Sequence, residues 1–277
     1  MNNLWVKSVI LGCKEIAYEI IFSSLTWRQK AKRILFRSQF LRRLKRHRIK
    51  KRCGIRYSEI TPTELSENGF ASLHLNLDEK FLQKMQNLDY HDNNSGQSVK
   101  GTDILNVTDA MCYGRFVAVG LDIMESDIKS LVNNEILMDH VNSYLGRNAL
   151  ISDISSWITT PTHLPLDHHE FGFHMDLGDT GGWKWLNVFI YLSDVDLSNG
   201  PHRAIKSTHY RRHWSSIWER RLSKERAEKI YAPDRFFTFE GPAGTVVIED
   251  TGNYHAASKV HIGSASRHIL QVVFRAE

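Results

Sequence analysis

The order of apolar and polar positions predicts helices early in the chain and mainly β structure after residue 149. Apolar residues recur at helical spacing in 78–88 and 126–145, and Gly146 is a natural end for the second helix. A charged segment at 210–231 predicts a helical insertion. Apolar runs bounded by Gly, Pro, Asn and Asp predict strands at 149–160, 170–176, 185–193, 235–240, 244–250 and 267–274. Short strands at this spacing favour a sandwich or a barrel.

Charge is distributed unevenly along the 277 residues. The stretch from Arg28 to Arg52 holds 13 Lys or Arg and no acidic residue, whereas the rest of the chain holds 23 basic and 31 acidic residues. The sequence therefore joins a basic arm to an acidic body. We expect residues 1–52 to form an amphipathic helix followed by this arm, and residues 53–277 to form one domain, because no repeat or long linker divides them.

The first segment, residues 4–27, is apolar but is interrupted by Lys7, Lys14, Glu15 and Glu19, which argues against a membrane-spanning helix. Two interpretations of residues 4–52 stay open. The helix can pack on the domain with the basic run solvated, or both parts can bind an anionic membrane surface as a peripheral anchor. Nucleic acid is a weaker candidate partner, because nothing else in the chain resembles a nucleic-acid-binding module.

Cysteine usage bears on the compartment. Cys13, Cys53 and Cys112 are odd in number and widely spaced, which gives neither a disulfide framework nor a CxxC metal site. We therefore expect a cytoplasmic protein, and the membrane interpretation would place it on the inner face of that membrane.

Candidate chemistry begins with His174 and Asp176, which lie two residues apart on an apolar, strand-like run. Side chains at this spacing on a strand point to the same face, so both can bind one ion. His255, on a distant predicted strand region, is the candidate third ligand. Two imidazoles and one carboxylate form the facial triad that holds Fe(II) and leaves positions open for a cosubstrate and O2.

A single arginine, Arg267, opens the otherwise apolar strand "RHILQVVF". A buried guanidinium needs an anionic partner, and its planar fork fits a carboxylate in bidentate geometry. A dicarboxylate bound to the metal at its other end would satisfy this requirement. Asn187, on the strand "WLNVFIYL", can face such a ligand or complete a hydrogen bond within its sheet.

These elements occur in one order: His174 and Asp176 in an HxD motif, then "VFIYLSDVDLSNGPHRAIKSTH", then "AGTVVIEDTGNYHAAS" with His255, then Arg267. This order resembles the phytanoyl-CoA dioxygenase-like family of Fe(II)- and 2-oxoglutarate-dependent oxygenases, over about residues 126–277. The chain departs from the family in one loop, where "STH" at 207–209 replaces the usual "GSH".

The resemblance implies a mainly β fold with flanking helices and a double-stranded β-helix (jelly roll, cupin-like) core. It implies iron held by His174, Asp176 and His255, and 2-oxoglutarate held at its distal carboxylate by Arg267. Family members couple oxidative decarboxylation of 2-oxoglutarate by O2 to hydroxylation of an unactivated C–H bond. Halogenating relatives lack the carboxylate ligand, so retention of Asp176 favours hydroxylation. The substrate class stays open between small molecules, lipid-linked compounds and glycans.

Two other classes of function stay open on the residues alone. A non-redox metal-dependent enzyme on a cupin-like barrel would keep the three ligands but would not need Arg267. A non-catalytic protein could use the basic arm to bind anionic lipid or nucleic acid and retain the pocket without using it.

Overall fold

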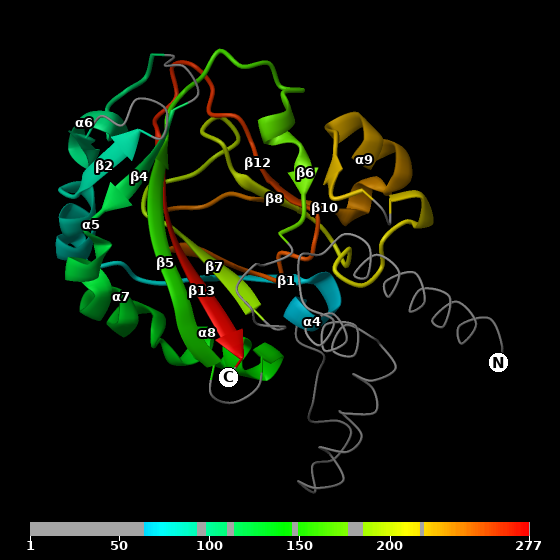
Figure 1. Cartoon of the computed structure of the whole chain (residues 1–277), viewed down its shortest axis with the longest axis horizontal. Coiled ribbons are helices and arrows are strands. Elements are labelled where there is room, and N and C mark those ends of the chain that lie inside the picture. The colour runs from blue at the N-terminus through cyan, green and yellow to red at the C-terminus, as the bar shows by residue number, and fades with distance from the viewer. Residues whose placement is uncertain are drawn as a thin grey trace, which may run out of the picture.

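We describe the protein from a computed structural model, in which residues 64–92, 98–109, 114–145, 149–176, 185–216 and 219–276 are described. Two antiparallel sheets face each other, and helices flank them (Figure 1). The predicted arm of residues 1–52 and the start of the predicted domain lie outside the described residues. Within the described residues, no helix is both long and apolar enough to cross a bilayer.

The larger sheet has eight strands in the order β1-β11-β7-β13-β5-β4-β2-β3. Its longest ladder joins β13 to β5 along almost the whole length of both strands, and the two run side by side in Figure 1. The strands are β1 (Phe70–His74), β2 (Asp89–Asp92), β3 (Ser98–Lys100), β4 (Arg115–Val119), β5 (Ala149–Thr159), β7 (Trp185–Tyr191), β11 (Thr245–Glu249) and β13 (Arg267–Ala276).

The smaller sheet has five short strands in the order β10-β8-β12-β6-β9. They are β6 (Phe173–His174), β8 (His202–Ile205), β9 (Arg221–Leu222), β10 (Phe236–Phe239) and β12 (His255–Ala257). Apolar residues at alternate positions of these strands form a separate cluster on the face turned away from the large sheet, which includes Phe173, Leu222 and Ala256. The small sheet is therefore a second layer with its own packing.

Helices cover the outer face of the large sheet (Figure 1). They are α4 (Glu64–Asn68), α5 (Glu79–Gln86), α6 (Gly101–Leu105), α7 (Glu125–Val132) and α8 (Glu135–Leu145), with the 3₁₀ turn η2 (Leu121–Met124) before α7. On the far side of the small sheet lies α9 (Lys224–Ile230), and three further 3₁₀ turns are η3 (His169–Phe171), η4 (Trp214–Ser216) and η5 (Pro233–Arg235).

Strand β7 contributes buried side chains to both faces of the large sheet. All seven of its residues are buried. Leu186, Val188 and Ile190 pack in the core beneath the helices, whereas Phe189 and Tyr191 belong to the cluster between the sheets. Because side chains alternate along a strand, Asn187 also faces the space between the sheets.

Three predicted elements differ from the structure. The helix predicted at 126–145 is two helices, because the Asn134 side chain accepts hydrogen bonds from the backbone of Ile136 and Leu137 and starts α8 anew. The strand predicted at 170–176 shortens to β6, with η3 before it. The insertion predicted as helical at 210–231 contains η4 and the strand β9, and its only described α-helix is α9, which begins after the cap Ser223.

The corner between α4 and β1 anchors a loop of the small sheet. Ser207 has a φ of 63°, a left-handed conformation that suits glycine better than serine. Its backbone NH donates to the carbonyl of Asn68 at 2.6 Å, and its hydroxyl donates to that of Glu67 at 2.6 Å. These bonds offset the strain, so the departure "STH" still forms a tight turn.

Candidate metal centre

The three predicted metal ligands lie close together in the structure. One ligand atom from each of His174, Asp176 and His255 lies within 4.8 Å of the others. The Nε2 atom of His255 is 3.4 Å from Oδ2 of Asp176, and Nε2 of His174 is 3.9 Å from Oδ1. Two imidazoles and a carboxylate at these separations fit a single divalent ion with ligands on one face.

The backbone around β6 explains this convergence. His174 pairs directly with His255 of β12, which brings the two imidazoles together with ring centroids 4.4 Å apart. Beyond β6, the NH of Met175 donates to the carbonyl of Arg220 and the NH of Asp176 donates to that of Thr251. Met175 is buried, so the extended course continues and Asp176 returns to the side of His174 although the strand has ended.

Both histidines are oriented by their second ring nitrogen. Nδ1 of His255 donates to the carbonyl of Asn253 at 3.1 Å, and Nδ1 of His174 lies 3.4 Å from that of Gly172. These contacts turn Nε2 of each ring toward Asp176, as is usual for metal-ligating histidines. Gly69 allows close packing against the loop that carries Asn253 and leads to His255. Its φ is +84°, and a side chain there would overlap Asn253.

The electrostatics of the three ligands are coupled. Burial raises the pKa of Asp176, but the hydrogen bond and charge of His255 outweigh it, so the pKa falls to about 2. Burial lowers the pKa of His174, with help from the charge of His255, to about 4. Burial also lowers the pKa of His255, but Glu249 and Asp176 raise it to about 9. At neutral pH and without a metal, Asp176 is therefore a carboxylate and His174 a neutral imidazole, the forms that bind metals, whereas His255 must release a proton when a metal binds.

Arg267 lies inside the protein, on β13 of the opposite sheet. It is 3% exposed, and its guanidinium donates to the carbonyl of Gly200 and lies 3.5 Å from the hydroxyl of Thr159. Burial raises the pKa of Tyr191 and lowers that of His202, and the charge of Arg267 acts to lower both, which places it near these interior side chains. A buried guanidinium is suited to a carboxylate ligand.

A buried pair, His202 and Glu249, bridges the two sheets between these groups. Nε2 of His202 donates to Oε2 of Glu249 at 2.7 Å, and both side chains are shielded from solvent. The ring of His202 stacks on that of His255 at 5.7 Å and lies 4.9 Å from that of Phe189. His202 thus contacts the predicted ligand His255, and the pKa of His202 is lowered by burial, with a contribution from the charge of Arg267.

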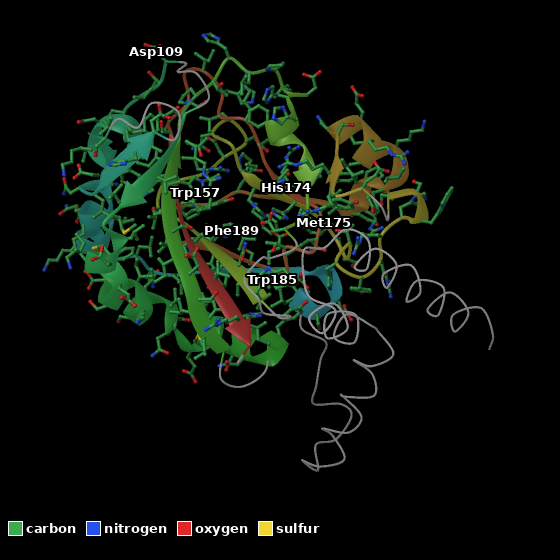
Figure 2. All side chains as sticks on the ribbon, in the orientation of Figure 1. Asp109, Trp157, His174, Met175, Trp185 and Phe189 are labelled. Atoms are coloured by element: carbon green, nitrogen blue, oxygen red, sulfur yellow. The ribbon has the colours of Figure 1, made fainter. Side chains whose placement is uncertain are left out.

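Asn187 is 5% exposed and lies in register with Glu249 on the neighbouring strand. In the part of the chain that the structure describes, its carboxamide makes no hydrogen bond with another side chain or with the backbone. Two roles were predicted for Asn187, and the hydrogen bond within its sheet is therefore not observed. Figure 2 shows Phe189 and Trp157 on the large sheet and His174 on the small one.

His202 and Glu249 are not among the site residues predicted from the sequence. A signal existed for Glu249, because a carboxylate inside the apolar run "GTVVIED" needs a buried partner. His202 follows a turn, and its buried role depends on pairing between β8 and β12, which no local pattern reveals.

Comparisons with known proteins give a fold but no family. No family model matches the chain, and no curated protein matches it. Among solved structures, HygX from Streptomyces hygroscopicus, crystallised with nickel, 2-oxoglutarate and hygromycin B, is 12% identical with a TM-score of 0.50, and the match covers 78% of this chain and 88% of HygX.

Two further structures match over a similar length. EctD from S. alaskensis with bound Fe is 16% identical, with a TM-score of 0.50 and coverage of 77% of this chain and 74% of EctD. SnoN, a non-heme alpha ketoglutarate dependent epimerase from nogalamycin biosynthesis, is 11% identical, with a TM-score of 0.50 and coverage of 77% and 78%. At these identities the likeness concerns the fold, and it confirms the predicted mainly β, jelly-roll architecture with flanking helices.

Proposed function

We propose that the protein is an Fe(II)- and 2-oxoglutarate-dependent dioxygenase similar to the phytanoyl-CoA dioxygenase-like family. It would hydroxylate an unactivated C–H bond of a small-molecule, lipid-linked or glycan substrate. The observation that carries the proposal is the convergence of His174, Asp176 and His255 on one sheet with the buried Arg267 on the other. Structures of similar fold bind iron or nickel and 2-oxoglutarate, which supports the same cofactors here.

The residues would divide the work as follows. His174, Asp176 and His255 would hold the iron, which when loaded with 2-oxoglutarate supplies O2 activation. Arg267 would bind the distal carboxylate of 2-oxoglutarate and so orient it. The aromatic rings of Trp157 and Phe189, whose centroids are 6.4 Å apart, would exclude water from the wall opposite the ligands. Asn187 would offer its carboxamide to 2-oxoglutarate from the same wall.

The first prediction concerns the metal and its cosubstrate. Anaerobic addition of Fe(II) and 2-oxoglutarate should produce the weak visible charge-transfer band of the chelate. His174→Ala should remove the band, with metal affinity reduced by more than about a hundredfold, beyond the usual effect of losing an outer partner. Arg267→Ala should retain metal binding but require about tenfold or more 2-oxoglutarate, because a charge-assisted pair is lost.

The same titration separates the oxygenase from the alternatives. A folded protein that binds metal through His174 but gives no band would contradict the 2-oxoglutarate assignment and favour a non-redox metal enzyme. A protein that binds no metal at all would favour a non-catalytic role.

We further propose, from the sequence alone, that residues 4–52 bind an anionic membrane surface as a peripheral anchor on a cytoplasmic protein. The full chain should sediment with vesicles that contain phosphatidylglycerol, and less so with neutral vesicles or at high salt, because the attraction is screened. Equal sedimentation with neutral vesicles would contradict the proposal.

A further inference from the structure

Two arginines of the segment predicted as a helical insertion lie beside the metal centre. Strand β9 pairs with β6, so that Arg221 lies directly opposite His174 and Leu222 opposite Phe173. Residues opposite each other in an antiparallel pair project to the same face. Leu222 and Phe173 pack together in the apolar cluster on the outer face, so Arg221 projects with His174 toward the ligands.

Arg220 approaches the centre from the same segment. Its carbonyl accepts the hydrogen bond from the NH of Met175 at 3.1 Å. Met175 lies between His174 and Asp176 in the chain, so this bond holds Arg220 next to the predicted ligands, and Arg221 lies directly opposite His174.

Neither guanidinium is used within the described part of the chain. Arg220 and Arg221 are exposed, and no hydrogen bond or ion pair occupies their side chains among the described residues. The neighbouring arginines differ: Arg226 pairs with Glu219 at 3.0 Å, and Arg203 donates to the carbonyl of Phe171 at 2.8 Å. Arg221 therefore faces the metal centre without a hydrogen-bond or ion-pair partner among the described residues.

Positive charges at this place require an explanation. Two histidines and one carboxylate leave a bound divalent ion with a net positive charge, so nearby guanidiniums repel it. The repulsion turns into attraction when an anionic group lies between them, and the guanidinium fork suits a carboxylate or a phosphate. Arg267, on the opposite sheet, already provides the buried cation for the distal end of 2-oxoglutarate.

We propose that Arg221, assisted by Arg220, binds an acidic group of the substrate, a carboxylate or a phosphate, at the rim of the metal centre. The proposal rests on the proposed function and deepens it by naming the substrate class: a compound that carries an anionic group near the C–H bond to be oxidised. The segment around β9 would then determine specificity rather than only cover the site.

The test uses the full chain loaded with Ni(II) and 2-oxoglutarate, so that no turnover occurs. Three probes, glucose 6-phosphate, glucuronate and glucose, are titrated by calorimetry. The wild type should bind a charged probe and not glucose, and the preferred probe distinguishes phosphate from carboxylate. Arg221→Gln should weaken that binding by about tenfold or more, since a charge-assisted contact is lost.

The matched control is Lys229→Gln, an exposed residue of α9 in the same segment that loses the same charge. It should bind the charged probe within about twofold of the wild type. The basic run of residues 28–52 is identical in all variants, so binding to it cannot produce a difference between them. The affinity for 2-oxoglutarate should stay within about twofold in Arg221→Gln, which separates substrate binding from cosubstrate binding.

The proposal would be overturned if neither charged probe bound at about 10 mM, a concentration that would detect even weak binding. It would also be overturned if Arg221→Gln and Lys229→Gln lost equal probe affinity. A third contrary result is a loss of 2-oxoglutarate affinity in Arg221→Gln as large as its loss of probe affinity. Failure of the proposed function looks different. The Fe(II) and 2-oxoglutarate band would be absent, while binding of a charged probe that depends on Arg221 would still support the anion site.

Discussion

The two sheets differ in the length of their strands and in the residues that they carry. The large sheet is held by long ladders, such as the one between β13 and β5, and its outer face lies in a core under the helices. The small sheet holds His174 and His255 on strands of two and three residues, β6 and β12, and Asp176 lies just beyond β6. Its geometry depends on loops and on hydrogen bonds beyond the strands. The contrast indicates that the main source of stability and the predicted metal ligands are located in different layers.

Core truncation in the large sheet should give the largest effect on stability. Leu270 is fully buried on the helix side of β13. Leu270→Ala should lower the free energy of unfolding by about 2–5 kcal/mol, because it removes buried methyl groups and leaves a cavity. Urea unfolding measures the loss. The metal affinity should be unchanged when measured well below the transition.

The control for this prediction is Leu197→Ala, because Leu197 is 65% exposed. Its effect should stay within about 0.5 kcal/mol. If Leu270→Ala weakened metal binding as strongly as stability, the separation between the two sheets would be wrong.

The His202–Glu249 pair should connect the two properties, because it joins β8 to β11 and touches the ring of His255. His202→Leu leaves a buried carboxylate without its donor, which costs about 3 kcal/mol. Metal affinity should also fall by about tenfold, since His255 loses a packed neighbour. Urea unfolding and metal titration of the same variant measure the two effects.

A second substitution sharpens this result. In the double variant His202→Leu with Glu249→Leu, stability should recover by about half or more, because no unpaired carboxylate remains. The metal affinity should not recover. A double variant as unstable as the single one would show that packing, rather than the unpaired charge, causes the loss.

A pH dependence of stability should arise in the large sheet. His268 is fully buried, with Nε2 2.7 Å from the hydroxyl of Tyr90 and 3.2 Å from that of Ser156. Burial lowers its pKa from 6.5 to about 3. Below pH 6.5 the unfolded chain binds a proton that the folded chain does not. The stability contribution of this group is therefore complete above pH 6.5 and decreases as the pH falls, by about 2 kcal/mol at pH 5.

The variant His268→Gln isolates this contribution from the other histidines. Its unfolding free energy should fall less steeply than that of the wild type between pH 6.5 and 5. Parallel curves for the two proteins would mean that His268 is not the source.

Sequence patterns predicted the fold best where strands are long. β5, β7 and β13 were predicted within one to two residues of most of their ends, because each carries a continuous apolar run. The sequence patterns predict no separate strand at β1, β2, β3, β4, β8, β9 or β12, and all of these are five residues or shorter, so a periodic pattern is weak in them. β9 was read as part of a helix, since arginines and glutamates at its position fit a charged helical face.

Spacing along the chain also selects His174, Asp176, His255 and Arg267 as candidates, and the structure brings the first three within reach of one ion. An HxD pair predicts a shared face even though β6 ends at His174, because the backbone continues in an extended course. The buried charge of Glu249 offered a similar signal. Arg220 and Arg221 offered none, because a charged residue on a surface segment is ordinary until its neighbour is known.

The sequence by itself determined the class of fold and the candidate ligands, because residue type and local spacing encode burial and side-chain direction. Tertiary structure alone decided what those residues face: the pairing of β6 with β12 and β9, the bridge between His202 and Glu249, and the placement of two unused arginines beside the ligands. The reason is that hydrogen-bond pairing between short strands depends on packing of the whole chain, and residues far apart in sequence carry no local record of it.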